Sequence, residues 1–299
     1  MRYVMKMEIY KIFSKKYIFL ISIVGLMLQM VISGQLRTTM FEGYHKSVYQ
    51  YYMSKLDGRY SDEKKDYVYG EYEKYQDLLN NEEKYENDYS TGRIGAEEYR
   101  ILSDEIKTAK YRIKTLEYIV EKTDYYNHSA RTAEYFYDTE IKDYMENLHL
   151  NIIAIIVILL IVIPMYTEDY YSGTIPMIRS SKNGRKELFS VRFILTVMIS
   201  CITYAVFSIT EFLIRDILFN LGNMQAGLES LMMDRFLEWP EYITNLPILK
   251  IIVLLYLIYM LAAVILGIVG LIVSKLSRGN IEAFTIMGIV LVGVRIFLR

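Results

Sequence analysis

The chain of 299 residues carries 34 lysines and arginines against 35 aspartates and glutamates, and 53% of its residues are apolar while 23% are charged. A single cysteine, Cys201, excludes a disulfide framework and any cysteine-based metal site, and three scattered histidines argue against a histidine-rich site. Glycine and proline are too few for a collagen-like or linker-like chain. The charged residues gather in one block and the apolar residues in runs, which predicts two kinds of structure in one chain.

Residues 1–16 come first and carry five basic side chains against one acid, Glu8. Because loops rich in lysine and arginine stay in the cytoplasm, this segment predicts a cytoplasmic N-terminus. We expect it to form an amphipathic helix, with Glu8 and Lys11 on it, ahead of the first membrane span.

Five apolar runs follow along the chain, at 17–35, 148–166, 193–214, 247–273 and 283–298. The first four are at least 19 residues long and the fifth has 16, broken by Arg295, whereas a bilayer core needs about 20 helical residues. The runs predict an all-α polytopic membrane protein with five transmembrane helices. Buried helices of a soluble protein are the alternative, and four runs of this length argue against it.

The first run could also be a signal peptide cleaved near Ile32-Ser33-Gly34. Its 19 apolar residues exceed the usual signal-peptide core, and the charged segment before it is long. We therefore interpret 17–35 as an uncleaved span.

Charges in the connecting segments predict which side of the membrane each one faces. Segment 167–192 has five basic residues and 274–282 has Lys275 and Arg278, so both are expected inside, whereas 215–246 has two basic and five acidic residues and is expected outside. The protein is thus predicted to be a multi-pass plasma-membrane protein. Five spans from a cytoplasmic start would leave Arg299 outside, so we expect a missing sixth span or a re-entrant fifth run.

Residues 37–147 form the charged block, with 17 basic and 24 acidic residues, a net charge of −7, and 19 of the 29 tyrosines. A heptad seam with spacings of three and four runs through Tyr99, Leu102, Ile106, Ala109, Ile113, Leu116 and Val120. A weaker stripe holds Val68, Tyr72, Tyr75 and Leu79. We predict an extracellular, coiled-coil-like hairpin of helices at about 65–88 and 96–122, then a third helix at about 130–147 that runs into the second span.

The tyrosines of this block allow two interpretations. Tyrosine suits recognition of an external compound, because its rigid ring has one polar end and loses little entropy when fixed. It also tolerates half-burial, so the same residues could fill a thin helical core. The sequence leaves both open.

No motif of enzyme chemistry occurs. The chain lacks a phosphate-binding GxxxxGK[ST] loop, GxGxxG, HExxH, CxxC and GxSxG, so we expect no catalytic residue, no metal site and no cofactor in this chain. Asn151 and Gln29 are polar groups at membrane depth and are expected to face other helices or an aqueous path.

The segment after the second span carries the most specific pattern. A glutamate, a glycine five residues on, an arginine in a turn and a basic residue seven further lie at Glu168, Gly173, Arg185 and Arg192. This pattern resembles the permease subunits of ABC-2 type ABC transporters. The family usually has lysine where Arg192 stands, and a proline before the arginine turn where this chain has Lys182-Asn183-Gly184. The amphipathic segment with Glu8 and Lys11 is also similar to the family.

The resemblance implies the membrane subunit of an ATP-driven exporter of a peptide, a lipid-linked or a hydrophobic compound. A separate ATPase subunit would hold ATP and Mg²⁺, and a second permease, identical or related, would complete the complex; no nucleic acid is expected. The coupling residues would be Glu168, Gly173, Arg179, Arg185 and Arg192, on a short surface helix at about 174–188. Glu168 is expected to pair with Arg185 or Arg192.

Two other functions remain open from the sequence. A span, an outer helical domain and a second span also describe membrane sensors or receptors, and a structural component of a membrane complex would have the same layout. The absence of a long signalling domain between the apolar runs, and the three further runs, favour the exporter.

Overall fold

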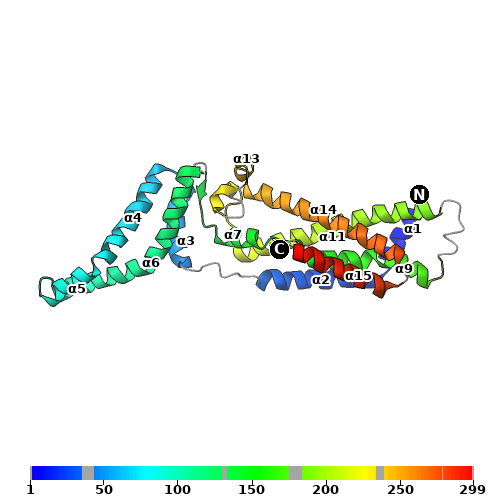
Figure 1. The fold of residues 1–299 in the computed structure, drawn as a ribbon, viewed down its shortest axis with the longest axis horizontal. Helices are drawn as coiled ribbons and strands as arrows, with labels where there is room; N and C mark the ends of the chain where they lie inside the picture. The colour runs from blue at the N-terminus through cyan, green and yellow to red at the C-terminus, as the bar shows by residue number, and fades with distance from the viewer. Residues whose placement is uncertain are drawn as a thin grey trace. The chain divides into compact units, whose positions relative to one another are not determined.

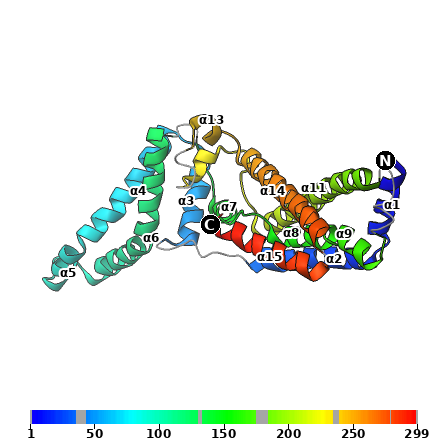
Figure 2. The same ribbon diagram turned by 45° about the vertical axis from the view of Figure 1, so that its right-hand side comes forward.

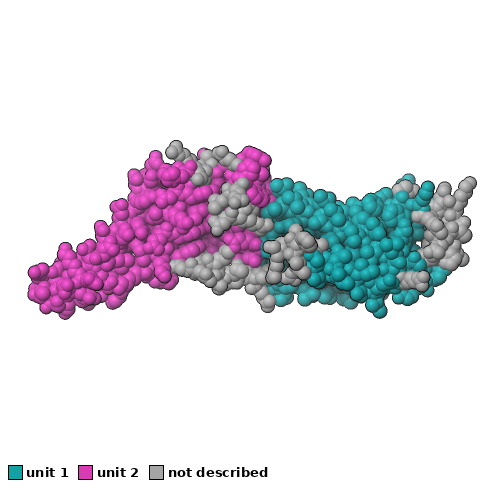
Figure 3. Space-filling model, viewed as in Figure 1, with its two compact units in different colours: residues 1–36, 148–219, 253–299 teal, residues 37–147, 220–252 magenta. Residues whose placement is uncertain are grey.

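The computed structural model describes residues 2–35, 44–129, 133–174, 184–233, 239–277 and 279–297. Most of these residues are helical, and the chain divides into two compact units (Figure 3). Unit 1 comprises Met1–Leu36, Leu148–Phe219 and Val253–Arg299, and unit 2 comprises Arg37–Asn147 and Asn220–Ile252.

Unit 1 contains the apolar helices (Figures 1 and 2). They are α1 (Arg2–Phe13), α2 (Lys16–Gln35), α8 (Ile152–Val162), α9 (Pro164–Tyr171), α11 (Gly184–Phe219), α14 (Ile248–Leu276), which begins in unit 2, and α15 (Asn280–Phe297). Four stretches are long and apolar enough to cross a membrane: Lys16–Gly34, Ile152–Tyr171, Lys186–Phe219 and Ile248–Leu276. The chain is thus an all-α protein with four candidate membrane spans. The apolar stretch of α15, Asn280–Gly293, is shorter, so a fifth span stays a prediction.

The second span differs from its predicted bounds of 148–166. It begins later, because the Asn151 side chain caps α8 by accepting a hydrogen bond from the backbone N–H of Ala154 (3.0 Å). It also continues past 166, since the helix resumes at Pro164 as α9. Proline lacks the backbone donor that a continuous helix needs but suits the first turn of a new one. The apolar run is therefore two helices with a break between them.

Helix α11, which contains the third candidate span Lys186–Phe219, begins at Gly184, well ahead of the predicted 193. Residues 184–188 belong to α11, so the separate surface helix expected at about 174–188 is wrong for that part, and 175–183 lie outside the described residues. Charged residues can extend a membrane helix into water because its backbone hydrogen bonds are already made within the helix. The predicted cytoplasmic segment 167–192 thus includes the ends of two spans.

Close packing of the spans rests on small residues. A Cβ built on Gly267 of α14 would lie 2.5 Å from Ser200 Oγ on α11 and 3.4 Å from Ile158 on α8. A Cβ built on Gly25 of α2 would lie 2.9 Å from the Val157 side chain of α8. Small residues allow helix backbones to approach each other in membranes, and here they hold α2, α8, α11 and α14 together.

Unit 2 contains the charged block. Its elements are α3 (Lys46–Leu56), β1 (Gly58–Arg59), α4 (Asp62–Asn80), α5 (Glu82–Ser90), α6 (Ala96–Ser129), β2 (Glu134–Tyr135), α7 (Thr139–Glu146), the 3₁₀ helix η1 (Leu228–Leu231) and α13 (Glu241–Thr244). The strands are antiparallel, with Gly58 opposite Tyr135. Helices α4 and α5 pack along α6 (Figure 1), at positions close to the predicted 65–88 and 96–122. Their location outside the cell stays a prediction.

The heptad seam supplies much of the contact between these helices. Ile106, Ala109 and Leu116 are buried, as is Val68 on the facing helix. The third helix predicted at about 130–147 is wrong in its extent. Strand β2 occupies Glu134–Tyr135, α7 covers only Thr139–Glu146, and Asn147 ends it before the second span begins.

The segment between the third and fourth spans belongs to unit 2. It does not form the separate loop predicted at 215–246. Helix α11 extends to Phe219, and 220–252 pack with the charged block. Ser230 binds both sides of the α6–β2 connection: its carbonyl accepts from the Tyr126 hydroxyl (2.5 Å), and its hydroxyl accepts from the backbone N–H of Glu134 (2.9 Å). Unit 2 is therefore built from two segments that are far apart in the sequence.

Tyrosines serve unit 2 mainly as core residues. Those buried are Tyr49, Tyr52, Tyr75, Tyr126, Tyr135 and Tyr144. Their rings contact one another, for example Tyr126 against Tyr135 edge-on at 4.9 Å between centroids. The core interpretation holds for these residues, while Tyr51, Tyr89 and Tyr111 remain exposed.

An ionic centre lies inside this tyrosine core. Lys122 and Asp138 are buried and form an ion pair at 2.6 Å, and the Tyr49 hydroxyl donates to the other oxygen of Asp138 at 2.6 Å. Burial lowers the pKa of Lys122 to about 8, although the neighbouring Asp138 carboxylate acts to raise it. Burial would raise the pKa of Asp138, but Lys122 and Lys142 outweigh it, and the pKa is lowered.

This centre predicts acid sensitivity for unit 2. Because the pKa of Asp138 is lower in the folded than in the unfolded chain, its stabilising contribution is complete above the unfolded value of about 3.9 and is lost as the pH falls through the folded value. We expect Asp138→Asn to lower the unfolding free energy at pH 7 by about 3–5 kcal/mol, because Lys122 stays buried without its partner. The variant should then lose less further stability on acidification than the original chain.

Thermal unfolding of the full chain in detergent, followed by tyrosine near-ultraviolet circular dichroism, measures this difference. Asp104→Asn is the matched control, because that carboxylate is 69% exposed and pairs with Lys107 at the surface. Identical pH profiles for Asp138→Asn and the original chain would contradict the assignment.

Candidate functional site

A cluster of six charged side chains lies at the end of unit 1 where α1, α9 and α11 meet. We call it the ionic junction, and its members are Glu8 and Lys11 of α1, Lys15 just after α1, Glu168 and Asp169 of α9, and Arg192 of α11. Figures 1 and 2 show these helices side by side near the N-terminus. Three acids face three bases, so the junction is electrically balanced.

Arg192 is the centre of the ionic junction. Its Nε and Nη2 donate to the two carboxylate oxygens of Glu8, each at 2.9 Å, and Nη2 also lies 2.6 Å from Asp169 Oδ2. The side chain is only 1% exposed, and its guanidinium carbon lies 4.5 Å from the centre of the Tyr166 ring. A planar guanidinium can bind one carboxylate with two parallel bonds and still reach another, whereas an ammonium acts as a single point charge. Arginine therefore suits this bridge between two acids better than lysine would.

The outer part of the junction is more exposed. Lys11 Nζ lies 2.7 Å from Asp169 Oδ1, Lys15 forms an ion pair with Glu168, and the Tyr17 hydroxyl lies 3.3 Å from the same carboxylate. The expected pairing of Glu168 with Arg192 is thus wrong, because Arg192 is already held by Glu8 and Asp169. Glu168 instead faces the link between α1 and α2.

The break in the second span positions the two acids. The Ile163 carbonyl, which precedes Pro164, accepts hydrogen bonds from the hydroxyls of Ser274 on α14 and Thr167 on α9. The Tyr170 hydroxyl donates to the carbonyl of Lys275 at 3.1 Å. Helix α9 is therefore fastened on one side to the end of α14 and on the other, through Asp169, to α1 and α11.

Gly173 forms the turn that follows the end of α9 at Tyr171. Its φ of +66° lies in the left-handed region, which costs glycine little. The following N–H, of Thr174, bonds back to the carbonyl of Asp169 at 3.2 Å. The turn directs the chain away from α9 directly after the ionic junction.

The other predicted coupling residues are less fully described. Arg179 lies outside the described residues, and Arg185 belongs to the first turn of α11 with no described side chain. The structure therefore brings together Glu8, Lys11, Glu168 and Arg192 of the predicted set. Sequence reasoning missed Asp169, Lys15 and Tyr166. Asp169 had a signal, because it stands beside Glu168 where membrane topology requires no acid.

The chemistry of the junction favours connection over catalysis. Exchanging a buried ion pair for apolar groups is often neutral for stability, but removing one member costs about 3–5 kcal/mol, because the other charge stays buried. Such a network therefore specifies which helices move together more than it stabilises them. Among the described residues, no group of three or more His, Cys, Asp or Glu side chains is placed to hold a metal ion.

No family model, no curated protein and no solved structure matches the chain. The resemblance to ABC-2 permeases thus stays a prediction that rests on the residues quoted for it.

The junction predicts strong energetic coupling between α1 and α11. We expect Arg192→Gln to lower the unfolding free energy by about 3–5 kcal/mol and Glu8→Gln by a similar amount, while the double variant costs less than their sum because neither leaves the other charge unpaired. Unfolding of the full chain in detergent measures the cycle. Lys6→Gln, an exposed residue of α1, is the control and should be near neutral. Additive losses would show that the two residues are not coupled.

Proposed function

We propose that the chain is the membrane subunit of an ABC exporter of the ABC-2 type. A separate ATPase subunit binds ATP and Mg²⁺, and two permease subunits with two ATPases form the complex. The transported compound is a peptide, a lipid-linked or a hydrophobic molecule. The single observation that carries this proposal is the ionic junction, because it ties α1 to both helices that flank segment 175–183.

That segment connects α9 to α11, and it is the part of the chain that we propose contacts the ATPase. Its two flanks carry Asp169 and Arg192, which form an ion pair at 2.6 Å. A displacement of the segment would therefore move the ends of the second and third spans together, with α1 following through Glu8. Rigid-body motion of packed helices is a known way to carry a change from one site to another.

Unit 2 has a different role in this proposal. The lysine and arginine residues of the segments that flank it in sequence are typical of cytoplasmic loops, and this supports a location of unit 2 on the outer side of the plasma membrane. There it gates the exit or contacts the exported compound. The N-terminus, α1 and the ionic junction then lie on the cytoplasmic side.

The orientation has a direct test, because Cys201 is the only cysteine. In a Cys201→Ser background, we expect Ser90→Cys, on the exposed turn of unit 2, to react with a membrane-impermeant maleimide in intact cells. Ser14→Cys, at the exposed end of α1, should react only after the cells are permeabilised. Labelling of Ser14→Cys in intact cells would reverse the topology.

The function is tested by co-purifying the chain with the ATPase encoded beside it and reconstituting the complex in lipid. We expect the chain to raise the ATPase rate, and Arg192→Gln to lower this stimulation about tenfold or more, within the range of typical couplings between sites. The Glu8→Gln/Arg192→Gln double variant should recover part of the stability, because Asp169 loses Arg192 but keeps Lys11, and it should remain uncoupled. This separates a coupling role from a folding role.

Lys6→Gln is again the control and should keep full stimulation. Two results would contradict the proposal: a chain that binds no ATPase, or a folded Arg192→Gln variant that keeps normal stimulation and transport. The second result would remove the coupling assignment even if the complex forms.

A further inference from the structure

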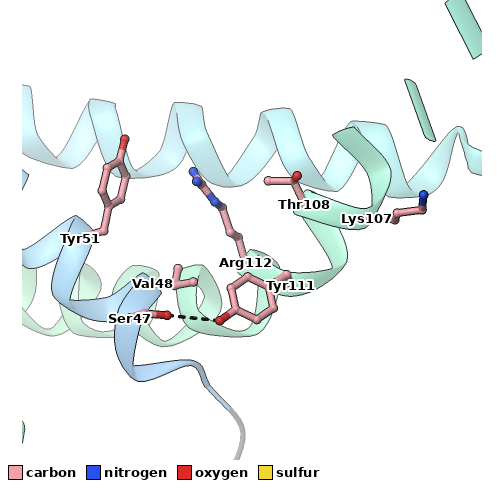
Figure 4. A pocket seen from close by; sticks show the side chains of 7 residues that line it. All are labelled: Ser47, Val48, Tyr51, Lys107, Thr108, Tyr111 and Arg112. Atoms are coloured by element: carbon pink, nitrogen blue, oxygen red, sulfur yellow. Dashed lines mark hydrogen bonds between the residues drawn. The ribbon is translucent and has the colours of Figure 1, made fainter. Parts of the chain in front are cut away.

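A pocket of about 490 Å³ lies between α3 and α6 of unit 2 (Figure 4). Its lining residues are Ser47, Val48 and Tyr51 of α3 and Lys107, Thr108, Tyr111 and Arg112 of α6. Sites for small molecules have volumes of about 300–1,000 Å³, so the pocket is large enough for one. All of its residues belong to one compact unit.

Two side chains define one side of the pocket. Figure 4 shows Tyr51 and Arg112 pointing in the same direction from their separate helices, with Thr108 beyond Arg112. The guanidinium carbon of Arg112 lies 5.3 Å from the centre of the Tyr51 ring, and Arg112 Nη1 donates to the Tyr75 hydroxyl at 3.1 Å. Lys55 Nζ lies 4.6 Å from the centre of the same ring, so two cations lie near Tyr51 at the edge of the pocket.

Some cations of this acidic unit are bound to neutral groups instead of carboxylates, for example Lys55 beside the Tyr67 hydroxyl and Lys64 on two backbone carbonyls, and Arg112 is another. Lys46, Lys110, Lys122 and Arg93 each have a carboxylate within ion-pair distance, but no ion pair joins Arg112 to a carboxylate within the described part of the chain. Its guanidinium instead bonds to neutral phenols, those of Tyr75 and Tyr52, so some of its five donors remain for a ligand. A guanidinium presents these donors as a planar fork that matches a carboxylate or phosphate.

The opposite side of the pocket offers a ring and hydroxyl groups. Ser47 Oγ and Tyr111 Oη are hydrogen-bonded at 3.2 Å, and the His45 ring stacks on the Tyr111 ring at 3.8 Å between centroids. Stacking on His45 holds the Tyr111 ring in place, although the residue itself is 46% exposed. A fixed, exposed aromatic face opposite a cation favours a ligand that is flat or apolar at one end and anionic at the other.

We propose that this pocket binds a small anionic compound. Its carboxylate or phosphate would lie on Arg112 and its flat or apolar part against Tyr51 and Tyr111, with the hydroxyls of Ser47 and Thr108 as further hydrogen-bonding groups. Lys107 contributes less, because it is held by Asp104 at 3.1 Å and is 73% exposed. The proposal does not depend on the export function, since a receptor could use the same pocket.

The test uses the full chain in lipid nanodiscs and three fluorinated probes observed by ¹⁹F NMR. They are 4-fluorobenzoate, 4-fluorophenyl phosphate and the neutral 4-fluorobenzamide. We expect at least one anion to bind at millimolar concentration or below and the amide to bind at least about tenfold more weakly, because hydrogen bonds to charged groups are the strong ones. The two anions distinguish a carboxylate ligand from a phosphate ligand.

The variants assign the binding to the pocket. Arg112→Gln should weaken the preferred anion about tenfold or more, and Arg112→Lys, which keeps the charge but not the fork, should weaken it less. Arg93→Gln, an exposed arginine in the same unit, is the matched control and should not change the affinity. Near-ultraviolet circular dichroism of the tyrosines checks that each variant is folded.

Three outcomes would overturn the proposal. The first is that neither anion binds, and the second is that the neutral amide binds as tightly as the anions. The third is that the folded Arg112→Lys and Arg112→Gln variants bind the anion as tightly as the original chain does. A loss of structure in Arg112→Gln alone leaves Arg112→Lys and Tyr111→Leu to decide, and both should weaken the anion. Loss of ATPase coupling has no bearing on these measurements, so the two proposals fail separately.

Discussion

The arrangement of unit 1 depends on one buried cation that is shared by two acids. Arg192 binds both carboxylate oxygens of Glu8 through Nε and Nη2 and lies against Asp169, and these three residues come from three helices. Each acid would be costly to bury alone. The position of α1 against the spans therefore follows from a charge requirement as well as from the apolar packing of Ile12.

Unit 2 also depends on buried polar groups that must be paired with one another. Its core is built from tyrosines, whose hydroxyl groups need partners when buried. Asp138 and Lys122 provide them for Tyr49, and the Tyr126 hydroxyl is satisfied by a carbonyl from the distant segment 220–252. The hydrogen bonds of buried polar groups thus join two segments that are far apart in the sequence. Hydrophobic burial alone would not specify this pairing. These hydrogen bonds also explain why so acidic a unit has a compact core.

The sequence predicts those features that depend on neighbours along the chain. The apolar run 17–35 matches α2, and the heptad seam correctly places Ile106 and Ala109 in the core, because hydropathy and helical period are local properties. Pairing across long separations is not local. No periodicity distinguishes Asp169 from Glu168 as the partner of Arg192, and nothing in 220–252 indicates that it completes unit 2. The functional assignment likewise rests on a short pattern.

The Glu8–Arg192 pair also imposes an order on biosynthesis. The two residues are 184 positions apart, so when α1 leaves the ribosome its buried partner has not yet been made. A carboxylate without that partner is stable only in contact with water or lipid headgroups. Helix α1 must therefore stay at the membrane surface, undocked, while two spans and all of residues 37–147 are synthesised. The synthesis of Arg192, near the start of α11, is then the event that allows the N-terminus of the protein to dock.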